Sequence, residues 1–175
     1  MTLKIEVVPY QSDWIELFQE EKMQLTRVIS EENFISLHHI GSTSVPSLSA
    51  KPIIDLLLVV KDISKLDLDN EKIASLGYLP RGEFGISGRR YFPKGGDNRT
   101  HHLHAFQYDN AYDISRHLLV RDYLRTHAEA RKSYANIKIA GAKKYPLNID
   151  GYGDYKDSFV KQLEKDAFIW HWKNQ

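Results

Sequence analysis

The chain has 175 residues, of which 42% are hydrophobic and 27% are charged, and its 24 Lys and Arg residues nearly balance its 23 Asp and Glu residues. This length is typical of one globular domain, and the formal net charge of +1 argues against an extended nucleic-acid surface. Cys is absent, which excludes disulfides, thiolate metal sites and a Cys nucleophile.

The sequence shows no pattern typical of export or membrane insertion. The first ten residues alternate apolar and charged side chains and lack the apolar core of a signal peptide. The most apolar run, Ile53 to Val60, is short and contains Asp55, so it cannot span a bilayer. We therefore expect a cytoplasmic protein with no membrane partner. Because no repeat or linker divides the chain, we expect one domain over residues 1–175.

Alternating apolar residues in the first half of the chain predict strands, with helical patterns between them. Leu3, Ile5 and Val7 predict a short strand, and Ser12 is a suitable N-cap for a helix of about 18 residues. The other elements expected in this half are strands at 34–40, 53–60, 90–93 and 102–107, a turn at 41–49 and a helix at 71–76.

The second half of the chain has helical periodicity. One helix is expected over residues 115–125. Thr126 followed by Glu129 matches a capping box, which predicts a second helix to about Lys143, and Asp154 can cap a last helix. Strands that come early and helices that come late predict an α+β fold: a small mixed sheet flanked by helices (about residues 1–110) and a helical C-terminal part (about residues 111–175).

Asp55 is the most unusual residue of the predicted strand 53–60. In strand geometry Ile53, Asp55 and Leu57 share one face, so the carboxylate stands among apolar neighbours. A carboxylate in such a place normally has a cation, a metal or several hydrogen-bond donors beside it. Asp55 is therefore either a metal ligand or general base, or the partner of a structural cation such as Arg90 or Lys51.

The turn before this strand contains Gly41, Ser42 and Thr43. A flexible backbone with hydroxyl groups next to a helix start can hold a phosphate, although short runs of this kind are also common in plain turns. Lys51 precedes Pro52 and is therefore extended, near the expected site. Its ammonium group could neutralise Asp55 or bind phosphate.

A local excess of positive charge follows in the middle of the chain. Between residues 81 and 104, two acidic residues stand against five basic ones, namely Arg81, Arg89, Arg90, Lys94 and Arg99. Arginine presents a planar fork that matches phosphate oxygens, so we expect this cluster to face Asp55 and Ser42. The alternative is a solvated hairpin.

The stretch from His39 to Val60 (HIGSTSVPSLSAKPIIDLLLVV) closely resembles the signature of the GrpB-type family, which is placed in the polymerase-beta-like nucleotidyltransferase superfamily. The resemblance covers nearly the whole chain. It extends to the residues 101–104 and 116–125, to Tyr134 and Lys138, and to the pair Tyr155 and Lys156. It implies a sheet of nucleotidyltransferase type with flanking helices.

The resemblance also implies roles for individual residues. In the superfamily a Gly-Ser pair contacts nucleotide phosphates, and carboxylates of an Asp-x-Asp strand hold two divalent cations, usually Mg²⁺ or Mn²⁺. By position, Gly41 and Ser42 are similar to the Gly-Ser pair and Asp55 to one acid, and a later helix would bring Arg121 to the nucleotide. This chain departs from the pattern because Ile53 and Leu57 stand where a second acid would be.

Histidines offer a different set of metal ligands. His102 and His104 are two residues apart in a predicted strand, so their rings project from the same face, and His39 stands just before Gly41. With Asp55 they would form a site of two or three histidines and one carboxylate, which favours Zn²⁺, Mn²⁺, Fe²⁺ or Ni²⁺ over Mg²⁺. Alternatively, the histidines cap the hairpin or donate to phosphate oxygens.

Three functions are compatible with these residues. The first is a metal-dependent nucleotidyltransferase with Asp55 and Ser42 as catalytic residues and Gly41, Ser42, Thr43, Lys51, Arg90 and Arg121 as phosphate contacts. The second is a binding module for a nucleotide or phosphorylated small molecule that has lost the transfer reaction. The third is a phosphoesterase whose metal is held by Asp55, His39, His102 and His104. Oligomeric state and acceptor cannot be predicted.

Overall fold

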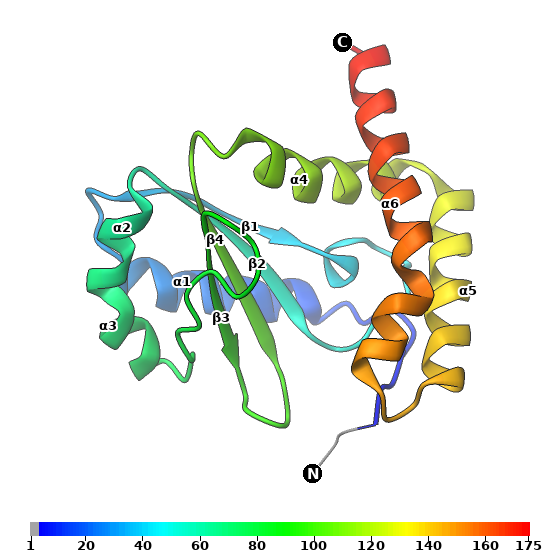
Figure 1. Cartoon of the computed structure of the whole chain (residues 1–175), viewed down its shortest axis with the longest axis horizontal. Coiled ribbons are helices and arrows are strands. Elements are labelled where there is room, and N and C mark those ends of the chain that lie inside the picture. Colours follow the sequence, from blue (N-terminus) through cyan, green and yellow to red (C-terminus); the bar gives the residue numbers. More distant parts are fainter. Residues whose placement is uncertain (1–3) are drawn as a thin grey trace.

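A computed structural model describes residues 4–175 of the chain (Figure 1). Four strands form one mixed sheet in the order β1-β2-β4-β3, and they are β1 (Phe34–Ile40), β2 (Ile54–Val60), β3 (Arg89–Lys94) and β4 (His101–Gln107). The central strands β2 and β4 are parallel, and the two outer strands pair antiparallel with them. The α+β fold with a small mixed sheet is therefore confirmed.

The register of the sheet places chemically different residues on its two faces. Asp55 pairs with His102, and Leu57 pairs with His104, across the parallel strands. Because side chains alternate along each strand, Asp55, His102 and His104 project from one face, which we call the site face. The residues between them, including Leu56 and Leu103, project from the other face, which we call the core face.

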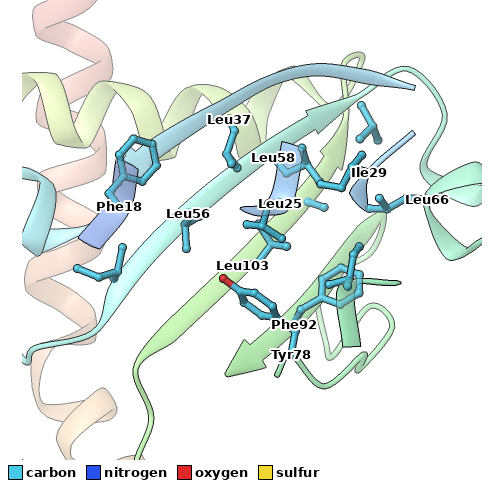
Figure 2. Packing of buried hydrophobic residues seen from close by; sticks show 14 of the residues in the cluster. Phe18, Leu25, Ile29, Leu37, Leu56, Leu58, Leu66, Tyr78, Phe92 and Leu103 are labelled. Carbon is cyan, nitrogen blue, oxygen red and sulfur yellow. The ribbon is translucent and has the colours of Figure 1, made fainter. Parts of the chain in front are cut away.

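Three helices cover the core face: α1 (Trp14–Val28), α2 (Ile63–Leu66) and α3 (Asn70–Ser75). Figure 2 shows Phe18 and Leu25 of α1 packed with Leu56, Leu58 and Leu103 of the sheet. Each of these leucines is fully buried, which contributes about 1.5–3 kcal/mol per side chain. The cluster fixes β2 and β4 rigidly beneath the site face.

The site face is covered along only part of its length. Helix α4 (Ala111–Thr126) packs Ile114 and Leu118 onto a small cluster that includes Leu57 and Phe106. Helices α5 (Ala128–Lys144) and α6 (Ile149–Lys173) stand side by side next to the sheet (Figure 1). This layer confirms the predicted helical C-terminal part, and among residues 4–175 no helix is long and apolar enough to cross a membrane.

The strand predicted at the N-terminus is wrong for the residues that the structure describes. Leu3 lies outside them, and Ile5 and Val7 are in no strand. The Ile5 N–H donates to the Pro146 carbonyl (2.7 Å), and Ile5 packs against Ala142 and Tyr152. The apolar alternation therefore reflects burial against the helical layer rather than pairing in the sheet.

Several predicted helix ends also differ from the structure. The Thr126 hydroxyl donates to carbonyls within the last turn of α4 instead of capping α5. Helix α6 starts before Asp154, because the Asn148 side chain accepts the Gly151 N–H (3.0 Å). Asp62 caps α2 in the same way, by accepting backbone N–H groups at 2.9 and 3.2 Å. Asn148 and Asp62 were thus overlooked as the caps of α6 and α2, whereas α5 begins after His127 with no side-chain cap.

Candidate functional site

Asp55 lies at the beginning of β2, where the turn after β1 passes directly over it. Gly41 in this turn has a φ of +70°, and a Cβ atom added there would lie 2.6 Å from Oδ2 of Asp55. A side chain at position 41 would therefore be strained and would displace the carboxylate. The glycine of the Gly41-Ser42 pair is needed because the backbone approaches Asp55 so closely.

Two histidines of β4 converge on the same carboxylate. Oδ1 of Asp55 lies 3.1 Å from Nδ1 of His102 and 3.5 Å from Nε2 of His104. Burial by itself would raise the pKa of Asp55, but hydrogen bonds to the two histidines and their charge lower it, so the pKa lies well below its ordinary value. Asp55 is thus an ionised acceptor facing two imidazole nitrogens.

These three side chains fit a divalent metal ion. One ligand atom from each lies within 4.8 Å of the others. Metal–ligand bonds of about 2.0–2.2 Å place neighbouring ligand atoms roughly 3–3.5 Å apart, so small side-chain movements would complete the site. The donor set of two imidazoles and one carboxylate suits Zn²⁺, Mn²⁺ or Fe²⁺ better than Mg²⁺.

A third histidine lies behind this cluster. The ring of His117 on α4 lies 5.5 Å from the ring of His104, centroid to centroid. Nδ1 of His104 and Nε2 of His117 are both buried without a hydrogen-bond partner among the described residues. Burial lowers the pKa of His104 despite the neighbouring Asp55, and it lowers that of His117 to about 3, so the His117 ring is neutral. His117 lies in the stretch 116–125 that resembles the family, but it was not proposed as a site residue.

His39 is not brought into this cluster. It pairs with Leu56 across β1 and β2 and so projects from the core face. Its Nε2 lies 2.9 Å from the Thr43 hydroxyl, and its ring stacks on Phe18 at 4.8 Å. Burial lowers the pKa of His39 to about 4. The neutral ring supports the turn that holds Gly41, and the candidate metal ligands are Asp55, His102 and His104.

A cavity of about 280 Å³ opens beside Asp55 and His102, between the sheet and helices α5 and α6. The turn residues Gly41, Ser42 and Thr43 form one wall. The helices supply the opposite wall with Tyr134, Lys138, Tyr152 and Lys156, and the segment before β2 adds Lys51. Three lysines therefore face a cavity in which, among the described residues, Asp55 is the one carboxylate.

The lysines are held in defined positions. Nζ of Lys138 donates to the Ser42 hydroxyl (2.8 Å) and to the Ser49 carbonyl, and it lies 4.4 Å above the Tyr134 ring. Lys51 and Lys156 both lie against the ring of Tyr152, at 5.2 and 5.0 Å. Burial and the neighbouring lysines lower the pKa of Lys138 to about 7, and burial also lowers the pKa of the other two.

Two arginines expected at the phosphates lie elsewhere. Arg90 projects from the core face and pairs with both oxygens of Asp67 (2.7 and 3.1 Å). Arg121 binds Asp122 (2.8 Å) and the His39 carbonyl (3.3 Å), so it ties α4 to the end of β1. The positive wall of the cavity comes instead from Lys138 and Lys156, whose approach to Ser42 and Asp55 depends on how the helices pack.

Comparison with known proteins places the chain among a group of bacterial relatives. A family described as "GrpB protein" matches residues 4–166. The chain is 46% identical to the UPF0157 protein YqkA of Bacillus subtilis, over 95% of this chain and 48% of that protein. It is 30% identical to the glutamate-rich protein GrpB of Alkalihalophilus pseudofirmus, over 91% of this chain and 94% of that one. The chain thus spans about half the length of YqkA.

Solved structures extend this comparison to the fold. The crystal structure of the conserved protein GrpB from Enterococcus faecalis superposes with a TM-score of 0.92 at 46% identity, covering 95% of this chain and 99% of that one. A structure of Cid1 in complex with its short product ApU matches with a TM-score of 0.51 at 12% identity, covering 75% of this chain and 42% of that one. The second likeness shows a shared nucleotidyltransferase fold.

Proposed function

Because the chain belongs to the GrpB protein family and has the nucleotidyltransferase fold, we propose that it is a metal-dependent nucleotidyltransferase that uses a nucleoside triphosphate. The observation that carries this proposal is one cavity lined by the Gly41-Ser42 turn, three lysines, Asp55 and His102, with the third candidate ligand, His104, beside Asp55. Each of these groups binds phosphate or a phosphate-bound cation in general protein chemistry.

Charge supports a polyanionic ligand in this cavity. Lys51, Lys138 and Lys156 outweigh the single negative charge of Asp55, and a divalent cation would increase the excess. Burial lowers the pKa of all three lysines, and repulsion from neighbouring lysines adds to this at Lys138 and Lys156, so a bound anion would stabilise their charged forms. A chain of phosphates would bring several negative charges into this cavity.

The residues of the chain would act by positioning and by charge. In the proposed reaction an acceptor hydroxyl forms a bond to the α-phosphorus, the bond to the pyrophosphate oxygen breaks, and the hydroxyl proton passes to water. A bound divalent cation would neutralise charge on the phosphate oxygens. Ser42 and Lys138 would hold the departing pyrophosphate, and Asp55, His102 and His104 would fix the reacting end. Little other covalent chemistry is required of the protein.

One observation favours a second function. Within residues 4–175, the cavity contains one carboxylate, whereas two-cation transfer enzymes use several. A chain that holds a nucleotide or phosphorylated small molecule without transferring any group would need no further acid. The experiment must therefore distinguish binding without turnover from nucleotidyl transfer.

The test incubates the purified protein with nucleoside triphosphates, a panel of hydroxyl acceptors that includes RNA ends, proteins and small molecules, and Mg²⁺, Mn²⁺ or Zn²⁺, and it measures released pyrophosphate and orthophosphate separately. We expect metal-dependent pyrophosphate release that falls at least about 100-fold in Asp55→Asn. Asp67→Asn is the matched control, because Asp67 pairs with Arg90 on the other face of the sheet. That variant should keep its activity.

Other outcomes distinguish the alternatives. Orthophosphate in place of pyrophosphate would identify a metal-dependent phosphoesterase. Binding without either product would identify a binding module, and a ligand at 100 times its Kd then stabilises the fold by about 2.7 kcal/mol. If the protein neither binds nor turns over any triphosphate, the proposed function is refuted.

A further inference from the structure

Phe84 is an exposed aromatic residue in an unusual backbone conformation. It lies in the segment between α3 and β3, which crosses in front of the sheet on the side opposite α1 (Figure 1). Its φ is +46°, a region that is disfavoured for residues with a Cβ atom, and 60% of the residue is exposed. Neither local backbone preference nor burial explains a phenylalanine at this position.

The surrounding loop is tightly held, so the ring has a defined position. The Arg89 guanidinium donates to the carbonyls of Phe84 (2.7 Å) and Glu83 (3.2 Å). The Glu83 carboxylate accepts the Gly88 N–H (2.8 Å), which closes the loop. Ile86 packs into the apolar cluster of the site face. These contacts maintain the strained conformation at Phe84 and anchor the loop over the site face.

A row of rings connects Phe84 with the candidate metal ligands. Phe84 stacks on Tyr91 with a centroid distance of 5.2 Å and an interplanar angle of 23°. Tyr91 in turn lies 5.4 Å from His104 and 5.7 Å from His102. The Tyr91 hydroxyl is within 3.5 Å of the Arg99 guanidinium, which fixes the far edge of the tyrosine. The exposed face of Phe84 is thus the outer end of a row of neighbouring rings, stacked between Phe84 and Tyr91 and tilted at the histidines, that leads to the candidate metal ligands.

A ligand that uses both regions needs phosphates at one end and a flat ring at the other. We propose that Phe84, backed by Tyr91, is the stacking surface for the nucleobase of a nucleotide whose phosphates occupy the lysine cavity. Stacking on an aromatic side chain tolerates any base, because every base has a π-face. This inference rests on the proposed function and adds where the base of the nucleotide binds, a contact that a phosphorylated sugar or inorganic polyphosphate could not make.

The experiment compares two probes that differ only in the presence of a nucleoside. The Kd values of ATP and UTP, and separately of inorganic triphosphate, are measured with Mn²⁺ by calorimetry. Phe84→Gly removes the ring and tolerates the positive φ, so the variant is expected to fold. Phe84→Tyr restores a ring, and Tyr112→Ala removes an equally exposed ring that stacks on Phe168 of α6.

We expect Phe84→Gly to weaken nucleotide binding by about 5- to 150-fold while the Kd of inorganic triphosphate stays the same. Phe84→Tyr should bind nucleotides as the unmodified chain does, and so should Tyr112→Ala. If Phe84→Gly loses affinity equally for nucleotides and for inorganic triphosphate, or for neither, Phe84 is not a stacking surface, and the proposed phosphate site is unaffected. An unmodified chain that binds inorganic triphosphate as tightly as ATP and UTP would lead to the same conclusion. Failure to bind any of the probes would overturn the proposed function as well.

Discussion

Replacing Gly41 by Ala tests whether the turn after β1 sets the position of the Asp55 carboxylate. The added methyl group would lie 2.6 Å from Oδ2 of Asp55 and 3.1 Å from its Cβ and Cγ atoms, with backbone φ at +70°. Neither the strand that carries Asp55 nor the turn can move freely, because Leu56 is fully buried and Arg125 donates twice to the Ser44 carbonyl (2.9 and 3.0 Å). The carboxylate must therefore rotate away.

Two costs follow from this geometry. An alanine at positive φ is disfavoured by about 1–2 kcal/mol. For a chain of this length each kcal/mol lowers Tm by about 2–4 °C, so we expect a Tm about 2–8 °C lower. Rotation of Asp55 also removes one ligand oxygen from the position facing His102 and His104, so the affinity for Mn²⁺ or Zn²⁺ should fall by about 10- to 100-fold.

Thermal unfolding and competitive metal titration measure the two effects separately. Gly153→Ala is the matched control, because Gly153 lies within α6 and a Cβ atom there would meet nothing within 4 Å. Removing a helical glycine should raise stability by about 0.5–1 kcal/mol and leave metal affinity unchanged. If Gly41→Ala binds metal as tightly as the unmodified chain, Gly41 does not position Asp55 and the reasoning is refuted.

Two further predictions concern residues around Asp55. His117→Phe should keep or raise Tm, because it removes a buried nitrogen without a partner and keeps a ring beside His104. Metal titration should be unchanged, because Nε2 of His117 and Nδ1 of His104 share no hydrogen bond, and a lower Tm or a weaker metal affinity would contradict this reasoning. Lys138, with a pKa of about 7, is half protonated at neutral pH and loses its charge as pH rises. The affinity for inorganic triphosphate should therefore fall between pH 7 and pH 9, and Lys138→Arg, which stays charged, should flatten the profile. An identical slope in the variant would exclude Lys138 as its cause.

The fold could be predicted from the sequence where periodicity was strong. The continuous apolar run of β2 indicated a central strand, and the small residues after β1 indicated a turn. The N-terminal alternation was misleading because Ile5 is buried against helices, a contact that no local pattern reveals. Helix ends were missed where Asn148 and Asp62 act as caps, since residues of similar capping preference follow within six positions: Asp150 and Asp154 after Asn148, and Ser64 after Asp62.

The candidate site could be predicted only in part, because strand order and register are set by long-range packing. The spacing of His102 and His104 was sufficient to place them on one face, but their position next to Asp55 depends on the parallel pairing of β2 with β4. The direction of His39 and Arg90 depends on which residue each one faces in the neighbouring strand, and a shift of one residue would reverse it. Lys156 comes from α6 and reaches the cavity only through tertiary packing.

The cavity also lies along the boundary between two layers of the molecule. Its walls come from the sheet with its preceding turn on one side and from α5 and α6 on the other, and the three inward-facing lysines repel one another across it. An anion bound there would contact both layers and remove that repulsion, so it would hold the helical pair against the sheet. Slower amide hydrogen exchange in α5 and α6 would then accompany ligand binding, and brief separation of the helices from the sheet would give the ligand a route in and out.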